Sequence, residues 1–171
     1  MPGFSFIIAR KSSLLTTKGQ SRTLSLDIFD QWEGLEQSGQ FRFTPPTHTI
    51  SAFHQAIAEL IEEGGVEGRA RRYRENQGLL VQGMRLLGFR EYLESEKQGY
   101  IISSFLYPED PKFSFTEFYS RLNDRGFVIY PGKLSHADCF RIGNIGKIYP
   151  QDISYLLRAI EAVIEEMNIT L

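Results

Sequence analysis

Residues 126–146 read GFVIYPGKLSHADCFRIGNIG. Two short apolar runs, Phe127–Tyr130 and Cys139–Ile142, are separated by the turn residues Pro131 and Gly132 and by a polar loop. Short apolar runs bounded by Gly and Pro are typical of strands. The stretch therefore predicts two strands of one small sheet, and it puts a charged side chain, Arg141, on a core strand.

The flanking segments predict helices and one more strand. Residues 100–107 form an apolar run that ends at Pro108, which predicts a strand. Helices are predicted from about Ile50 to Ile61, from about Val66 to Leu87, over 113–122, and from Pro150, a favourable first-turn residue. This order of elements indicates an α/β or α+β domain with a small, largely antiparallel sheet.

The N-terminal part looks different. The run Phe4–Ala9 predicts a buried strand, residues 11–23 predict a loop with about one helical turn, and residues 26–35 predict a short helix ended by Ser38 and Gly39. A buried strand at a chain end is unusual, because chain ends are usually frayed and exposed. We therefore expect residues 1–45 to be the trailing part of a larger domain and residues 46–171 to be a C-terminal small domain.

Composition excludes several classes. The chain has 171 residues, a net charge of -2, 42% apolar residues and 23% charged residues, which argues against a disordered protein and against a nucleic-acid binder with a broad basic face. Its one cysteine, Cys139, allows no intrachain disulfide, and with only three histidines a metal site is not expected. No apolar run approaches a membrane span, and no signal peptide is recognisable, so a cytoplasmic protein is expected.

Two residues are candidates for anion binding. Arg141 lies on a predicted strand just before two glycines, where its planar fork of donors could hold a carboxylate or phosphonate. The alternative is a structural ion pair with a nearby Asp or Glu. Thr44 precedes a predicted helix start, which is a natural phosphate site, although simple capping by Thr47 or a neighbour is the commoner outcome.

Other reactive residues have ordinary interpretations. Lys133 follows a turn and is interpreted as solvated rather than as an anion contact. Cys139 is interpreted as a buried, inert thiol, and the arginines of residues 69–74 as a solvated helix face. No nucleophile or carboxylate is spaced recognisably with the three histidines, which are His48, His54 and His136.

Four motifs together resemble a known family. They are residues 43–49 (FTPPTHT), 62–66 (EEGGV), 126–133 (GFVIYPGK) and 139–146 (CFRIGNIG). In this order they resemble the 2-aminoethylphosphonate:pyruvate transaminases, which are class V aminotransferases of fold type I. The resemblance extends over essentially the whole chain.

The resemblance implies a function, a cofactor and two site residues. Members of the family use pyridoxal 5'-phosphate to transfer the amino group of 2-aminoethylphosphonate to pyruvate, giving phosphonoacetaldehyde and L-alanine, and they are homodimers. By position, Arg141 matches the arginine that anchors the anionic end of the substrate. Thr44 matches the residue that reaches the cofactor phosphate of the partner subunit.

The same resemblance implies that the catalytic lysine is missing. In the family, the Schiff-base lysine lies a few residues before the segment that corresponds to Pro2–Phe4, and none of the lysines here occupies that place: they are Lys11, Lys18, Lys97, Lys112, Lys133 and Lys147. We therefore expect a C-terminal part of such an enzyme, comprising the end of the large domain and the small domain, with no catalytic residue of its own and no activity alone.

Three alternatives remain open. The parent enzyme could be another class V transaminase, of the alanine–glyoxylate or phosphoserine type. The chain could instead be a non-catalytic module that binds an anion at Arg141 or interacts with a partner. A separately encoded N-terminal half could also complete the enzyme by association.

Overall fold

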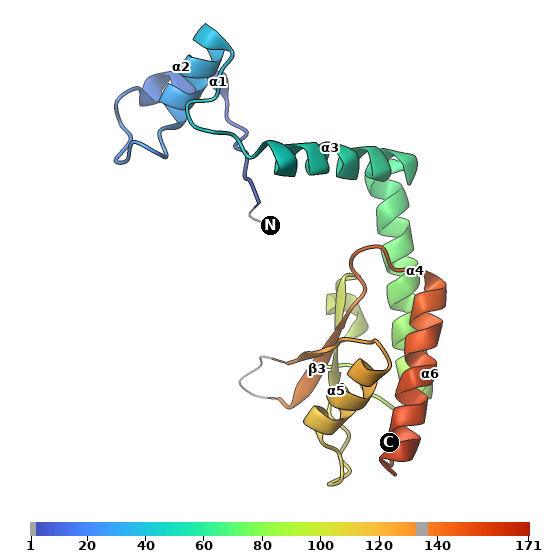
Figure 1. Cartoon of the computed structure of the whole chain (residues 1–171). Coiled ribbons are helices and arrows are strands. Elements are labelled where there is room, and N and C mark those ends of the chain that lie inside the picture. The colour runs from blue at the N-terminus through green and yellow to red at the C-terminus, as the bar shows by residue number, and fades with distance from the viewer. Residues whose placement is uncertain (1–2, 133–136) are drawn as a thin grey trace. The chain divides into compact units, whose positions relative to one another are not determined.

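The computed structural model describes residues 3–132 and 137–171, and the chain divides into two compact units (Figure 1). The first unit is Met1–Glu62 and the second is Glu63–Leu171. The change from one unit to the next falls at the glycine pair Gly64–Gly65, where the sequence predicts a helix end. The assignment of residues 1–45 and 46–171 to two domains of a larger protein stays a prediction.

The second unit is a small antiparallel sheet covered by helices. Its elements are α4 (Gly65–Leu86), η2 (Ser95–Lys97), β1 (Ile102–Leu106), α5 (Phe115–Asp124), β2 (Tyr130–Pro131), β3 (Cys139–Gly143) and α6 (Pro150–Glu166). The strand order is β1-β3-β2, and both pairings are antiparallel. The predicted mixed fold with a small antiparallel sheet is confirmed. Strand β2 is shorter than the run 127–130, because only Tyr130 and Pro131 pair with β3.

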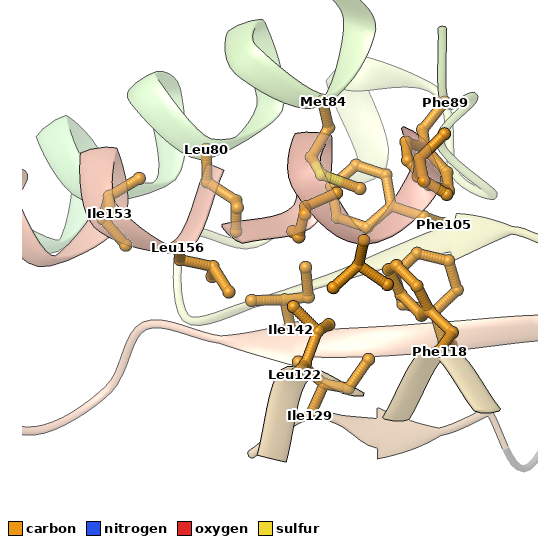
Figure 2. Packing of buried hydrophobic residues seen from close by; sticks show 14 of the residues in the cluster. Leu80, Met84, Phe89, Phe105, Phe118, Leu122, Ile129, Ile142, Ile153 and Leu156 are labelled. Carbon is orange, nitrogen blue, oxygen red and sulfur yellow. The ribbon is translucent and has the colours of Figure 1, made fainter. Parts of the chain in front are cut away.

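One face of this sheet packs on the helices. Phe105 and Ile142 point into a core that α4, α5 and α6 complete (Figure 2), and Phe140 belongs to the same buried cluster. The helices contribute Leu80, Met84, Phe118, Leu122, Ile153, Leu156, Ile160 and Val163 to it. Burying a side chain of this size stabilises a fold by about 1.5–3 kcal/mol relative to leaving it exposed. This single core therefore provides the second unit with its own hydrophobic stabilisation.

Helices α4 and α6 run side by side (Figure 1) and approach closely at Gly83. A Cβ atom at this position would lie 2.3 Å from Leu157 Cδ1, so any larger residue would require the Leu157 side chain to move. The end of α4 also depends on glycine, because Gly88 has φ +101° and follows the helix directly. The predicted stop at Gly88 is confirmed.

The first unit has little core of its own. Its elements are α1 (Lys11–Leu14), η1 (Leu15–Thr17), α2 (Ile28–Ser38) and α3 (Thr47–Glu62). Asp27 caps α2 by accepting from the Asp30 amide, and Gly39 with φ +68° ends it. Phe29 is the only core residue of this unit in the part of the chain that the structure describes.

Two apolar segments of the first unit are exposed. The predicted strand at Phe4–Ala9 is wrong: the segment forms no strand, and Ile8 is 90% exposed. A strand needs a neighbour to pair with, and the described residues provide none. The predicted apolar face of α3 is also uncovered, since Phe53, Ile57 and Ile61 are all exposed. No helix within the described residues is long and apolar enough to cross a bilayer.

Candidate functional site

Arg141 lies at the centre of β3, which is the middle strand of the sheet. Its Cα partners are Ser104 on β1 and Tyr130 on β2. Side chains alternate along a strand, so Arg141 points away from the face that Phe140 and Ile142 share with the core. It is half-buried, and its Nε donates to the carbonyl oxygen of Pro131 at 3.2 Å. This bond orients the guanidinium from one side.

Arg141 has no carboxylate partner among the residues that the structure describes. No ion pair includes it, and neither terminal nitrogen of its guanidinium forms a hydrogen bond within that part of the chain. Arginines that are fully buried are almost always paired, whereas this half-buried arginine keeps its terminal nitrogens without a partner among the described residues. Its two terminal NH₂ groups are therefore free to hold two oxygens of an anion side by side.

The segment that follows Arg141 is fixed by hydrogen bonds of Asn144, which is completely buried. Its side-chain amide donates to the carbonyls of Tyr73, at 3.1 Å, and Tyr100, at 3.0 Å. Its backbone amide also donates to the carbonyl of Ile101. These bonds join the end of β3 to α4 and to the chain before β1, which limits how far Arg141 can move.

Arg72 on α4 fixes the next segment. Its guanidinium donates to the carbonyls of Gly146 and Ile148 at 2.7 and 2.8 Å, and it pairs with the carboxylate of Glu63. Arg69 binds the same carboxylate at 2.7 Å. The interpretation of residues 69–74 as a solvated face is therefore wrong for Arg69 and Arg72. The side chain of Arg72 is only 13% exposed, because the segment 144–149 folds over it.

The two arginines also change the acidity of Glu63. Hydrogen bonds from Arg72 and then Arg69 stabilise its charged form and lower its pKa to about 2. The asparagine Asn76, which is fully buried one turn after Arg72, adds a hydrogen bond to the carbonyl of Ile148 at 2.8 Å. The segment after β3 is thus tied to α4 by at least three side chains.

Thr44 lies in the extended segment between α2 and α3, and its side chain is exposed. Neither Thr44 nor Thr47 forms a side-chain hydrogen bond with any described residue, so the capping alternative through the Thr47 hydroxyl is not observed. The turn is closed instead by backbone bonds, from the Thr47 amide to Pro45 and from the Ile50 amide to Pro46. Thr44 belongs to the first unit and Arg141 to the second.

The remaining candidates contribute less. Cys139 is 3% exposed, and this burial raises the pKa of its thiol, as expected of a buried cysteine that is not a nucleophile. His48 and His54 are exposed on α3. Lys133 and His136 lie outside the described residues. Within those residues, no group of His, Cys, Asp or Glu side chains could hold a metal ion.

No family model matches the chain. Curated relatives do match it. It is 57% identical over 164 residues to the 2-aminoethylphosphonate–pyruvate transaminase of Phocaeicola vulgatus, and 54% identical over 165 residues to that of Vibrio cholerae. The alignments cover 95% and 96% of this chain but 45% of each relative. The resemblance to these transaminases is confirmed, and the chain spans about half the length of the curated relatives it matches.

Solved structures with a similar fold include two aminotransferases. An alanine–glyoxylate aminotransferase from Nostoc sp. gives a TM-score of 0.71 at 18% identity, covering 85% of this chain and 40% of that one. A ureidoglycine–glyoxylate aminotransferase from Bacillus subtilis gives 0.68 at 19% identity, covering 83% and 37%. A serine palmitoyltransferase from S. paucimobilis, solved with bound PLP, gives 0.52 at 16% identity, covering 64% and 28%. These similarities establish the fold of the chain.

Proposed function

We propose that this sequence is part of a pyridoxal-phosphate-dependent enzyme that transfers the amino group of 2-aminoethylphosphonate to pyruvate. The products are phosphonoacetaldehyde and L-alanine. The observation that carries the proposal is 54–57% identity over about 95% of the chain to relatives that bear this name. The activity is proposed for the whole protein that contains these residues.

In this function, Arg141 binds the anionic end of the substrate. Its guanidinium is oriented by the Pro131 carbonyl and by the fixed backbone of β3, and its terminal nitrogens have no partner among the described residues. A charge-assisted hydrogen bond is worth about 1.5–3 kcal/mol. Because the residue is half-buried, water competes less for the anion than it would at an exposed arginine. Arg141 would thus hold the substrate while its amino end reacts elsewhere.

The chain offers one residue that fits the cofactor. The Thr44 hydroxyl is exposed and has no partner among the described residues, so it can donate to a phosphate oxygen. We propose that it reaches the cofactor phosphate of a partner subunit in a homodimer. When bound, the cofactor supplies an electron sink for the carbon that loses its proton. The residues of this chain bind and orient the reactants.

We further propose that the 171 residues are inactive alone, because no lysine stands where the resemblance implies that the cofactor is held. The test measures alanine formed from 2-aminoethylphosphonate and pyruvate, first with these residues as the only protein and then with the complete protein. Alanine formed by the 171 residues alone would contradict this part. Faster turnover of the complete protein with glyoxylate and alanine, or with phosphoserine, would assign it to another transaminase type.

A matched pair of variants tests the role of Arg141 in the complete protein. We expect Arg141→Ala to raise the KM for 2-aminoethylphosphonate by about 10- to 100-fold, which corresponds to the loss of one charge-assisted interaction. Arg71→Ala is the control, because Arg71 is exposed on α4 and no described residue pairs with it. Equal KM values for the two variants would remove Arg141 from the site. If the complete protein formed no alanine but still bound 2-aminoethylphosphonate through Arg141, the anion-binding alternative would gain support.

A further inference from the structure

We infer that Ser104, Arg141 and Tyr130 form one phosphonate-selective subsite across the open face of the sheet. The three residues are direct neighbours on three adjacent strands, because Ser104 pairs with Arg141 in β1–β3 and Tyr130 pairs with Arg141 in β2–β3. The inference rests on the proposed function for its substrate. It adds the two hydroxyl residues that select the kind of anion.

The register places all three side chains on the same face. Directly opposite residues of an antiparallel pair point to one side of the sheet, with Cβ atoms about 4.5–5.5 Å apart. The neighbouring residues Ser103, Phe140 and Ile142 are buried on the other side. The row Ser104–Arg141–Tyr130 therefore lies on the side that the helices of the core do not cover.

The donors in the row are unused. Ser104 Oγ and Tyr130 Oη form no hydrogen bond with any described residue, and the terminal nitrogens of Arg141 form none either. Ser104 is half-buried and Tyr130 is 53% exposed, so both hydroxyls can be reached from solvent. Within residues 3–132 and 137–171, no carboxylate forms an ion pair with Arg141. The row thus contains one guanidinium and a hydroxyl residue on each neighbouring strand, and these donors have no partner among the described residues.

The surroundings of the row strengthen its interaction with an anion. On one side of the row lie Ile102 and Gly143, and on the other side lie Leu106 and Cys139, which are direct partners in the β1–β3 ladder. These side chains cannot hydrogen-bond strongly to an anion or compete for it. Electrostatic attraction is greater where the surroundings are apolar.

The number of donors favours a phosphonate over a carboxylate. A carboxylate has two oxygens in one plane, which the Arg141 fork satisfies alone. A phosphonate has a third oxygen outside that plane and can carry a second charge. The two neighbouring strands each place one hydroxyl residue directly opposite Arg141, and we assign these hydroxyls as the donors to the third oxygen. Ser104 and Tyr130 are therefore specificity-determining residues, and Arg141 alone would bind either anion.

The test uses the 171-residue chain and two probes that share the same ethyl group, ethylphosphonate and propionate, titrated by NMR. We expect the chain to bind ethylphosphonate more tightly, with shift changes at β1, β2 and β3. Ser104→Ala and Tyr130→Phe should each reduce the ratio of the two affinities by about 10- to 100-fold, the value of one lost hydrogen bond to a charged group. Arg141→Ala should abolish binding of both probes.

Ser103→Ala is the matched control, because Ser103 is adjacent on β1, 1% exposed, and faces the core. It should leave the ratio unchanged. An unchanged ratio in both Ser104→Ala and Tyr130→Phe, or no phosphonate binding at the sheet, would overturn the inference. Failure of the proposed function gives a different result. The complete protein would then form no alanine from 2-aminoethylphosphonate, even if the 171-residue chain bound the two probes as expected.

Discussion

Arginine has two roles in this chain, and its partners distinguish them. Arg72 has a carboxylate and two carbonyl oxygens around it, so its donors are used within the fold. Arg141 has one carbonyl oxygen and keeps two terminal nitrogens without a described partner. Since a half-buried charge is costly unless it is paired, Arg141 is the one of these two whose location calls for a ligand.

The buried amide of Asn144 should make a large contribution to stability. Replacing it in Asn144→Ala leaves the carbonyls of Tyr73 and Tyr100 without a donor, which costs about 1–3 kcal/mol. Urea unfolding followed by circular dichroism measures this loss. Asn123→Ala, at an exposed position near the end of α5, should change stability by no more than about 0.5 kcal/mol. Similar values for the two variants would mean that the buried bonds contribute nothing.

Glu63 should make the stability of the folded chain depend on pH in the acidic range. Its folded-state pKa is about 2, below the ordinary value of 4.5, so the unfolded chain binds the proton more readily than the folded chain does. Stability from this group is complete above pH 4.5 and is lost as the pH falls towards 2. We expect the urea midpoint to fall over this range and the fall to be smaller in Glu63→Gln. Glu161→Gln, on the exposed side of α6, should show the same pH dependence of the urea midpoint as the unmodified chain. If Glu63→Gln also showed that pH dependence, the prediction would be contradicted.

At the scale of an element, the first turn of α4 lies very close to the backbone of Glu63, just before the helix. A Cβ atom at Gly68 would lie 1.9 Å from the carbonyl oxygen of Glu63, whereas one at Gly78, on the same helix, would meet nothing within 4 Å. Gly68→Ala must therefore move the backbone at Glu63, which also displaces the Glu63 carboxylate from Arg72.

The two glycines make a matched pair for measurement. We expect Gly68→Ala to destabilise the protein by about 1–3 kcal/mol through overpacking. Gly78→Ala should instead stabilise it by up to about 1 kcal/mol, because alanine favours a helix over glycine. Chemical unfolding of both variants gives the two signs, and two changes of the same sign would show that the contact at Gly68 relaxes without cost.

At the scale of the whole molecule, the two units differ in how much they bury. Residues 63–171 contain the whole aromatic and aliphatic core cluster, whereas residues 1–62 bury Phe29 alone within the described range. Conformational entropy must be offset by burial, so the first unit should be far less stable by itself. It also leaves Phe53, Ile57 and Ile61 of α3 exposed.

The single tryptophan makes this difference measurable. Trp32 lies on α2 in the first unit, where it contacts Phe29, so its fluorescence reports that unit. Far-ultraviolet circular dichroism reports the helices of both units, including α4 and α6 of the second unit. We expect the fluorescence transition at lower urea than the main dichroism transition. A fragment of residues 63–171 should keep the main transition, and coincident transitions in the whole chain would mean that the units unfold as one.

The sequence by itself determined the elements whose signal is local. The apolar stripe predicted for α6 comprises Ile153, Leu156, Leu157, Ile160, Val163, Ile164 and Met167. Six of the seven are buried, and Leu157 is half-buried against the same core. Gly39 and Gly88 end their helices as predicted, because a positive φ is a local requirement that glycine meets. Helical stripes together with short apolar runs bounded by Gly and Pro predict the mixed antiparallel fold. The motifs around Arg141 and Thr44 carry the family resemblance.

The tertiary structure alone decided which polar groups are buried and paired. Asn76 and Asn144 are fully buried, and the Arg72 side chain is only 13% exposed. Each bonds to a carbonyl about 70 residues away in the chain. No local pattern reveals such a partner, which is why Arg72 was interpreted as solvated. The strand expected at Phe4–Ala9 fails for the same reason: pairing depends on a distant neighbour, and apolar composition can favour a strand without providing one.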